Sequence, residues 1–267
     1  MSREKDGEVL SFLEFAETLV KQAGEVALRY YGRGNPHVRF DDELVTTADL
    51  AIRDVIRTSI ADQYPEHRLL GEGPNHKSYR HGEQGFQWII DPVDGTANFQ
   101  AGIPIWGISL ALFENFWPIA GVFYMPVTGD LYKALAGRKA KLMVNNTPVK
   151  VEPEVIANNE SVLLTYSRFH NDFRSTFPGK IRNLGSTAAH LCYVASGRAE
   201  ASLHKYVHIW HLAAGQVLLE AAGGEIRYLD GRQFHLNDYL DSQKIDEPLL
   251  AAPAGGHTLI TQYLEPL

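Results

Sequence analysis

The clearest helical pattern in the chain lies near its N-terminus, in residues 11–31. Ser11 followed three residues later by Glu14 matches a capping box, and Gly32 is a typical helix stop. Apolar residues recur at steps of three and four, which is typical of an amphipathic helix; they are Phe12, Phe15, Ala16, Leu19, Ala23, Val26, Ala27 and Tyr30. The pattern predicts a helix over 11–31 with one buried face.

A second helix is predicted over residues 47–63. Ile52, Val55, Ile56 and Ile60 recur at helical spacing, and Pro65 lies just beyond the predicted end. The polar residues 33–43 between the two helices show neither helical nor strand periodicity. We therefore expect them to form a loop.

From Phe86 onward the pattern changes to short runs that favour strands. Residues typical of β-turns separate these runs, as at Thr128-Gly129 and Asn145-Asn146. The predicted strands are residues 86–90, 105–113, 118–124, 130–136 and 143–144.

The second half of the chain alternates between the two kinds of pattern. Helices are predicted over 187–196 and 210–222, the latter ending at Gly223-Gly224, and Asp230-Gly231 indicates a hairpin. The predicted strands are 161–166, 199–203 and 249–252, the last followed by a C-terminal helix. Helices and strands in both halves predict an α+β or α/β layered fold.

Composition narrows the class of protein. With 45% hydrophobic and 21% charged residues among 267, the chain has the composition of an ordinary globular protein with a large core. A net charge of −7 argues against a broad nucleic-acid surface. Cys192 is the only cysteine, the N-terminus is charged, and no long apolar run occurs. We expect no intramolecular disulfide, no signal peptide, no membrane span and a cytoplasmic location.

Residues 88–99, with the sequence WIIDPVDGTANF, carry the strongest chemical signal. Asp91 and Asp94 follow a predicted buried strand, and a carboxylate-rich turn after a strand can hold divalent cations. Gly95 and Thr96 can present backbone N–H groups to an anion. A cation and an anion at one turn predict metal-assisted chemistry on a phosphate.

A structural reading of the same residues is also available. Asp-Pro and Asp-Gly are common turn formers, so an isolated Asp91 and Asp94 would more often cap a β-turn. Thr96 can cap a helix with its hydroxyl, which is compatible with a catalytic role. The aromatic context and further motifs elsewhere favour metal ligation.

Three segments in this order and spacing carry a family resemblance: residues 70–72 (LGE), 88–99 and 210–215 (WHLAAG). Together they resemble the inositol monophosphatase-like family of metal-dependent phosphatases. Weaker matches at residues 19–26, 44–49 and 182–186 and at Gly197 extend the resemblance over nearly the whole chain.

The resemblance implies an α+β fold, a layered αβαβα sandwich of the inositol monophosphatase/fructose bisphosphatase type. The whole chain, 1–267, would then be a single phosphatase-like unit. Residues 1–153 would form an N-terminal α+β half with the metal-binding motif, and residues 154–267 a C-terminal α/β half facing the substrate. Family members commonly form dimers, so a homodimer is expected.

The resemblance also implies a site for two or three Mg²⁺ ions. One metal would be held by Glu72, Asp91 and the backbone carbonyl of Val93. A second would be held by Asp91, Asp94 and an aspartate from a later Trp-Asp motif.

In the same family pattern, phosphate would bridge the metals and accept hydrogen bonds from the amides of Gly95 and Thr96. Glu72 and the Thr96 hydroxyl would orient the attacking water. The cations would neutralise the phosphate, lower the pKa of the water and stabilise the leaving alkoxide.

Further positions are implied around this centre. Gly185, Ser186 and His204 lie where the family binds substrate. Asp49 would line the metal site through water, although its place at a helix start also suits the helix dipole. Glu43 stands where the family usually has aspartate, so both acidic residues are expected to be peripheral.

The chain departs from the family pattern at three positions. His211 replaces the aspartate of the Trp-Asp motif, Gly73 replaces a second glutamate, and His204 stands near a substrate-binding glutamate of some members. Mg²⁺ prefers oxygen ligands, whereas imidazole suits Zn²⁺, Mn²⁺ or Co²⁺. The second site is therefore expected to bind Mg²⁺ less well, with Mn²⁺ or Zn²⁺ as alternatives.

Two readings of His211 remain open, a ligand facing the second metal position and a non-ligating role. A separate metal cluster of His204, His208 and His211 is disfavoured, because the segment starts in strand-like sequence and the three would not share one helix face.

Two functions follow. The first is metal-dependent hydrolysis of a small phosphate monoester, such as inositol monophosphate or a related sugar phosphate. The second is a degenerate relative that binds a phosphorylated ligand or a partner without turnover. Retention of Glu72, Asp91, Asp94 and Thr96 favours the enzyme, whereas His211 favours the binding protein.

Overall fold

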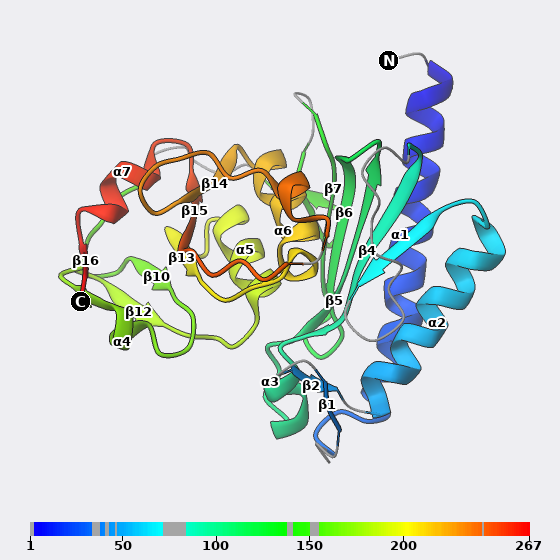
Figure 1. Cartoon of the computed structure of the whole chain (residues 1–267), viewed down its shortest axis with the longest axis horizontal. Helices are drawn as coiled ribbons and strands as arrows, with labels where there is room; N and C mark the ends of the chain where they lie inside the picture. Colours follow the sequence, from blue (N-terminus) through cyan, green and yellow to red (C-terminus); the bar gives the residue numbers. More distant parts are fainter. Residues whose placement is uncertain are drawn as a thin grey trace.

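Two β-sheets and three groups of helices form five alternating layers in the computed structural model (Figure 1). In order, the layers are a helix pair, a large sheet, a second helix pair, a smaller sheet and short outer helices. The structure describes residues 3–33, 38–40, 43–45, 47–71, 84–137, 141–149, 155–241 and 243–267. The predicted αβαβα layering is therefore confirmed.

The large sheet has seven strands in sequential order. Its first two strands are parallel and each later neighbour is antiparallel. The strands are β3 (Arg68–Gly71), β4 (Phe86–Asp94), β5 (Gly107–Glu114), β6 (Trp117–Met125), β7 (Asp130–Leu135), β8 (Met143–Val144) and β9 (Thr147–Pro148).

The smaller sheet has five strands in the order β12-β10-β13-β15-β14. They are β10 (Val162–Leu164), β12 (Lys180–Arg182), β13 (Ala201–His204), β14 (Gly224–Tyr228) and β15 (Leu249–Pro253). Two short antiparallel ribbons complete the strands, β1 (Val38–Phe40) with β2 (Glu43–Val45) and β11 (Phe173–Ser175) with β16 (Leu264–Pro266).

The helices take defined places in the layers (Figure 1). The outer pair on the large sheet is α1 (Arg3–Leu28) and α2 (Thr47–Gln63), and the pair between the sheets is α5 (Thr187–Ala195) and α6 (Ile209–Ala221). The shorter helices are α3 (Thr96–Ala101), α4 (Phe169–Asp172), α7 (Gly256–Thr261) and the 3₁₀ helix η1 (Leu236–Tyr239). No helix in the described ranges is long and apolar enough to cross a membrane.

Alternation along β4 builds two separate cores. Trp88 and Ile90 pack into the cluster formed with α1 and α2, whereas Ile89 packs into the cluster formed with α5 and α6. Successive side chains of a strand point to opposite faces, so one strand contributes to both layers. The end of β4, where the aspartate motif begins, is therefore enclosed between two packed layers.

The structure corrects three element predictions. The first helix begins at Arg3 rather than Ser11, whose hydroxyl donates within the helix to the Glu8 carbonyl at 2.7 Å. The upstream segment is rich in charged helix formers, and Val9 extends the apolar face. The expected loop over 33–43 contains β1 and the first residue of β2. Three-residue strands carry too little periodicity to be predicted.

The third correction concerns β4, which was expected to end before Asp91. The strand continues to Asp94, with a shift in pairing between Asp91, opposite Ser109, and Asp94, opposite Gly107. Pro92 lies within this irregularity, which is where a strand tolerates proline. The aspartate motif is thus part of the sheet rather than a separate turn.

Candidate functional site

The end of β4 places two buried carboxylates beside the start of α3. Asp91 and Asp94 are 1% and 4% exposed. The Thr96 hydroxyl donates to the Val93 carbonyl oxygen at 2.9 Å, so it does not cap α3 as the structural reading predicted. The N-cap position belongs to Gly95. Carboxylate, carbonyl and hydroxyl oxygens are therefore gathered within six residues.

Two glycines let this motif approach the loop before α5 closely. A Cβ at Gly95 would lie 3.2 Å from the Gly185 carbonyl oxygen, and a Cβ at Gly185 would lie 2.8 Å from Asn98 Nδ2. Both residues have positive φ, 91° at Gly95 and 77° at Gly185. Asn98 Nδ2 fixes the approach by donating to the Leu184 and Ile105 carbonyls, each at 2.6 Å. The structure thus brings Gly185 against the motif.

Asp94 is bound to the N-terminus of α5. Its carboxylate accepts hydrogen bonds from the Ser186 hydroxyl, from Thr187 N at 3.2 Å and from Ala188 N at 2.8 Å. Ser186 in turn caps the helix by accepting from Ala189 N at 3.2 Å. Burial raises the pKa of Asp94 to about 6, although these hydrogen bonds act to lower it. Asp94 therefore acts as a second cap of α5 in this structure.

His211 lies in the first turn of α6 and faces Asp91. Its Nδ1 accepts a hydrogen bond from His208 N at 3.1 Å, and its Nε2 lies 3.9 Å from Asp91 Oδ2. The His208 and Trp210 rings stack at 4.4 Å, and the Trp210 and His211 rings meet edge to face at 5.8 Å. Burial lowers the pKa of His211 to about 3, so the imidazole is neutral.

A second group of buried histidines lies near the site. The Ser202 hydroxyl and His204 Nε2 are 2.8 Å apart, and the His190 and His204 rings are 5.9 Å apart. His190 Nε2 accepts from Leu184 N at 3.0 Å. Burial lowers the pKa of His190 to about 4 and that of His204 well below its ordinary value. His190 thus supports the loop before α5 as a neutral ring, and His204 packs beside it as a second neutral ring.

The remaining predicted residues are only partly described. Asp49 is buried on α2, and Arg53 donates to its carboxylate at 3.2 Å. Glu43 begins β2, and only its backbone is described. Glu72 and Gly73 lie outside the described residues. In the described part of the chain, no three His, Cys, Asp or Glu side chains form a group that could hold a metal ion.

Sequence reasoning missed Asn98, His190 and Ser202. Asn98 lies inside the recognised motif, but its bonds join residues far apart in the chain, which a linear pattern does not show. Ser202 and His204 are two residues apart on one strand, so strand alternation could have placed them on one face.

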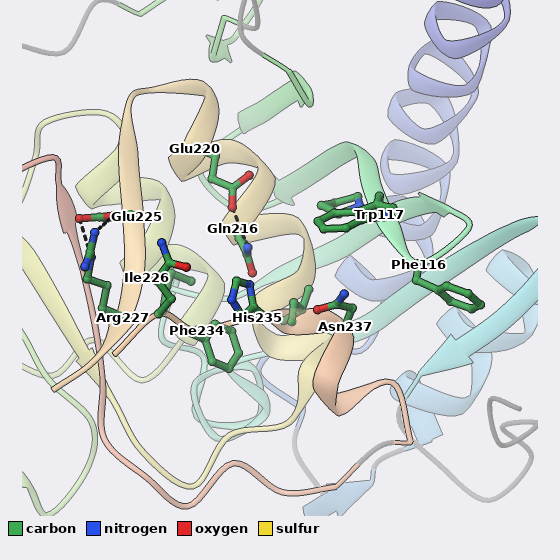
Figure 2. Close-up of a pocket in the computed structure, with 13 residues that line it drawn as sticks. Phe116, Trp117, Gln216, Glu220, Glu225, Ile226, Arg227, Phe234, His235 and Asn237 are labelled. Carbon is green, nitrogen blue, oxygen red and sulfur yellow. Dashed lines mark hydrogen bonds and ion pairs between the residues drawn. The ribbon is translucent and has the colours of Figure 1, made fainter. Parts of the chain in front are cut away.

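A separate pocket lies along the C-terminal part of α6 and contains none of the predicted site residues (Figure 2). Its volume is about 240 Å³. Gln216 and Glu220 of α6 line it together with Phe116 and Trp117 at the start of β6 and Arg227 of β14. The chemistry predicted from sequence gathers instead at the opposite end of α6, around His211.

Comparison with known proteins gives a consistent result. The model of the inositol monophosphatase family matches residues 8–262. The chain is 34% identical over 232 residues to the histidinol-phosphatase of Chlorobaculum parvum, which covers 83% of this chain and 87% of that protein. It is 30% identical over 243 residues to human inositol monophosphatase 1, covering 84% of this chain and 86% of the human protein.

Solved structures share the fold. The structure of an IMPase from Thermotoga maritima superimposes with a TM-score of 0.80 at 24% identity, covering 94% of this chain and 96% of the other. That likeness bears on the fold alone. It agrees with the five-layer arrangement predicted from the sequence resemblance and seen in Figure 1.

Proposed function

The chain belongs to the inositol monophosphatase family, and from that premise we propose that it hydrolyses a small phosphate monoester with one divalent cation held at the end of β4. Two relatives, 34% and 30% identical to this chain, are named as phosphatases. The observation that carries the proposal is the buried Asp91 carboxylate, two residues before the Val93 carbonyl, at the meeting point of α3, α5 and α6.

The donors at this position fit a hard cation. Asp91 and Val93 supply oxygen atoms, which Mg²⁺ and Mn²⁺ prefer. A carboxylate that is 1% exposed is costly unless positive charge or hydrogen bonds compensate it, and a bound cation supplies such charge. Glu72, predicted from the family pattern as a further ligand, follows β3, which is the parallel neighbour of β4.

When bound, the cation would neutralise phosphate charge and lower the pKa of the attacking water. The protein would do the rest with its own groups. Asp91 and the Val93 carbonyl would hold the cation, and the Thr96 hydroxyl, already directed at Val93, would stay within reach of the water. Glu72 would take the proton of that water, and the first amides of α3 would bind the phosphate oxygens.

The substrate belongs to the class of small phosphate monoesters. Histidinol phosphate and inositol monophosphate are the first compounds to test, because relatives are named for activity on them. Gly185 and Ser186 contact the motif through Asn98 and Asp94, which supports a leaving group bound on this side. His204, bonded to Ser202 on β13, is proposed as a further substrate residue. The buried, neutral His204 offers a hydrogen-bonding group without charge.

The test is a phosphate-release assay over a panel of phosphate monoesters with Mg²⁺, Mn²⁺ or a chelator. We expect hydrolysis of at least one ester that the chelator abolishes and that added Mg²⁺ or Mn²⁺ restores. Activity that persists in chelator would contradict the cation requirement. No release from any ester with any divalent metal would contradict the enzyme.

A second candidate function is binding of a phosphorylated ligand without turnover. It is favoured by one observation, that Asp94 and His211 both act as helix caps in this structure. It predicts that phosphate monoesters bind measurably in calorimetry but release no phosphate.

A further inference from the structure

Both backbone polar groups of Leu184, in the loop before α5, are hydrogen-bonded to side chains of other elements. The Leu184 N–H donates to His190 Nε2 of α5 at 3.0 Å, and the Leu184 carbonyl accepts from Asn98 Nδ2 of α3 at 2.6 Å. Asn98 belongs to the motif of residues 88–99, so Leu184 connects that motif to α5. The position of the loop thus depends on His190 on one side and on Asn98 on the other.

His190 joins α5 to this loop through both its backbone and its side chain. Its backbone N–H donates to the Ser186 carbonyl at 3.1 Å in the first turn of α5, and its Nε2 reaches back six residues to Leu184. The other buried residues of α5 are small or apolar: Ala188, Ala189, Leu191, Cys192, Val194 and Ala195. Burying an imidazole costs free energy unless it is hydrogen-bonded, so the bond to Leu184 accounts for a histidine at this position.

Part of the loop is exposed and yet held in place. Asn183 and Gly185 are exposed, whereas Ser186 is buried and donates to Asp94. Asn183 Oδ1 accepts from Gly185 N at 2.8 Å, and Asn183 Nδ2 donates to Ser167 Oγ at 2.9 Å. The exposed part of the loop is therefore accessible to a ligand and fixed in its position beside the motif.

We propose that His190 is a positioning residue for the leaving group: by accepting the Leu184 N–H, it holds residues 183–186 where they bind the organic part of the ester. This inference rests on the proposed phosphatase function, in which the leaving group lies on the side of Gly185 and Ser186. His190 is itself only 3% exposed, so it acts through the loop and does not touch the substrate. A shift of about 1 Å in a binding group can cost about 100-fold in rate, so loss of this hydrogen bond has a measurable effect.

Three variants separate this hydrogen bond from the packing of α5. His190→Leu keeps a buried side chain but removes the acceptor. His190→Gln restores an acceptor, because the glutamine amide oxygen can take the place of Nε2. Val194→Ala is the matched control: it opens a cavity on the same helix, and so destabilises the fold, without removing a bond to the loop.

The first measurement is hydrogen exchange of the Leu184 amide by NMR, in chelator. An asparagine followed by a leucine occurs only at Asn183-Leu184, so ¹³C-asparagine and ¹⁵N-leucine labelling identifies this amide. We expect exchange in His190→Leu to be at least about tenfold faster than in the wild type, because local opening of the loop becomes easier. His190→Gln and Val194→Ala should resemble the wild type. Equal exchange in His190→Leu and the wild type overturns the proposal.

The second measurement is phosphate release from histidinol phosphate and inositol monophosphate, with inorganic phosphate as a competitive inhibitor. Inorganic phosphate has no leaving group, so its inhibition constant reports on the cation and the motif alone. We expect His190→Leu to raise KM for the hydrolysed ester about tenfold or more and to leave the inhibition constant within about twofold of the wild type. His190→Gln should restore KM to within about threefold, and Val194→Ala should retain both constants.

Asn183→Ala covers the case that His190→Leu does not fold, because Asn183 is exposed. It removes the acceptor of the Gly185 N–H and should raise KM for the ester without changing the inhibition constant of inorganic phosphate. An unchanged KM in this variant overturns the inference.

The outcomes separate this inference from the function on which it rests. Equal rises in KM and in the inhibition constant of His190→Leu, or no recovery in His190→Gln, overturn the inference while leaving a phosphatase. Absence of hydrolysis by every form of the protein overturns the proposed function, and with it the leaving-group role of His190. Exchange at Leu184 then still shows whether His190 holds the loop.

Discussion

The end of β4 and the first turns of α5 and α6 use similar side chains in different ways. At β4, Asp91 and Val93 lie in a strand that is buried along most of its length, and we propose that their oxygens hold the cation. At the helices, Asp94 accepts the N–H groups of α5, and His211 accepts the His208 N–H of α6. A family motif identifies residues that could bind metal. Whether such a residue is available to do so depends on whether its side chain already accepts hydrogen bonds from the N-terminus of a helix.

The largest effect should come from the strand side of this comparison. We expect Asp91→Asn to abolish cation binding and to reduce phosphate release at least about 100-fold, since loss of an outer partner of a metal ligand already costs about 10–100-fold. Phosphate-release kinetics and Mn²⁺ titration measure both effects. Asp54→Asn, at an exposed position on α2, is the control and should match the wild type. Equal turnover in the two variants would remove Asp91 from the site.

A pH effect is expected on the helix side. Burial lowers the pKa of His190 from its ordinary value of 6.5 to about 4, so the unfolded chain binds a proton in this range that the folded chain does not. The contribution of His190 to the free energy of unfolding is therefore fully present above pH 6.5. It is lost as the pH falls toward 4, which lowers the free energy of unfolding by about 3 kcal/mol.

His190→Gln tests this, because glutamine can still accept from Leu184 N but does not titrate. Urea unfolding in chelator between pH 4 and 7 should show a smaller loss of stability in the variant than in the wild type. His170→Gln, at an exposed position, should follow the wild type. Parallel curves for wild type and His190→Gln would show that His190 is not buried as a neutral ring.

The contact between the two regions can be tested with a pair of glycines. Gly185 and Gly129 have nearly equal φ, 77° and 76°, but a Cβ at Gly185 meets Asn98 at 2.8 Å, whereas nothing lies within 4 Å of one at Gly129. Alanine at either position costs about 1–2 kcal/mol for the left-handed backbone. Gly185→Ala should cost about 1–3 kcal/mol more, from overpacking.

Denaturant unfolding of the two variants measures this difference. Phosphate release adds a second readout, since Gly185→Ala displaces α5 from the motif and Gly129→Ala lies in the distant β6–β7 turn. Equal stability losses in the two variants would mean that the loop before α5 moves to accommodate the added Cβ without a loss of unfolding free energy.

The smallest expected effect concerns the cap of α5. Ser186→Ala removes the N-cap hydroxyl and one donor to Asp94, which should cost about 1 kcal/mol. Ser196→Ala, at the other end of the same helix, removes a hydroxyl that donates to the carbonyls of Cys192 and Tyr193 within that helix. Its cost should be within about 0.5 kcal/mol. Thermal unfolding in chelator compares the stabilities of Ser186→Ala and Ser196→Ala. An equal or larger loss of stability in Ser196→Ala would contradict the role of Ser186 as the N-cap of α5.

Much of the fold could be predicted from sequence where periodicity is long. The pattern over Ile52, Ile56 and Ile60 predicted α2 with the bounds that the structure gives. The start of α1 was wrong because its charged first turns carry no apolar signal, and β1 and β2 were missed because three residues show no period.

The sequence predicted which residues lie together at the candidate site, but not which hydrogen bonds they form. Spacing and resemblance indicated Asp91, Asp94 and His211 together, and the structure places them at one end of β4 and its facing helices. That Asp94 caps α5 and that His211 Nδ1 accepts a helix N–H are tertiary facts. They depend on the helices being brought to the sheet, which no local pattern records.

The central claim is that residues at the end of β4 bind a cation, whereas Asp94 and His211 cap helices. The most direct test is the number of Mn²⁺ ions bound per wild-type chain, counted by electron paramagnetic resonance in the presence of inorganic phosphate. One ion, lost in Asp91→Asn and retained in His211→Gln, is the predicted result. Two ions per wild-type chain, with the second lost in His211→Gln, would contradict it and make His211 a metal ligand.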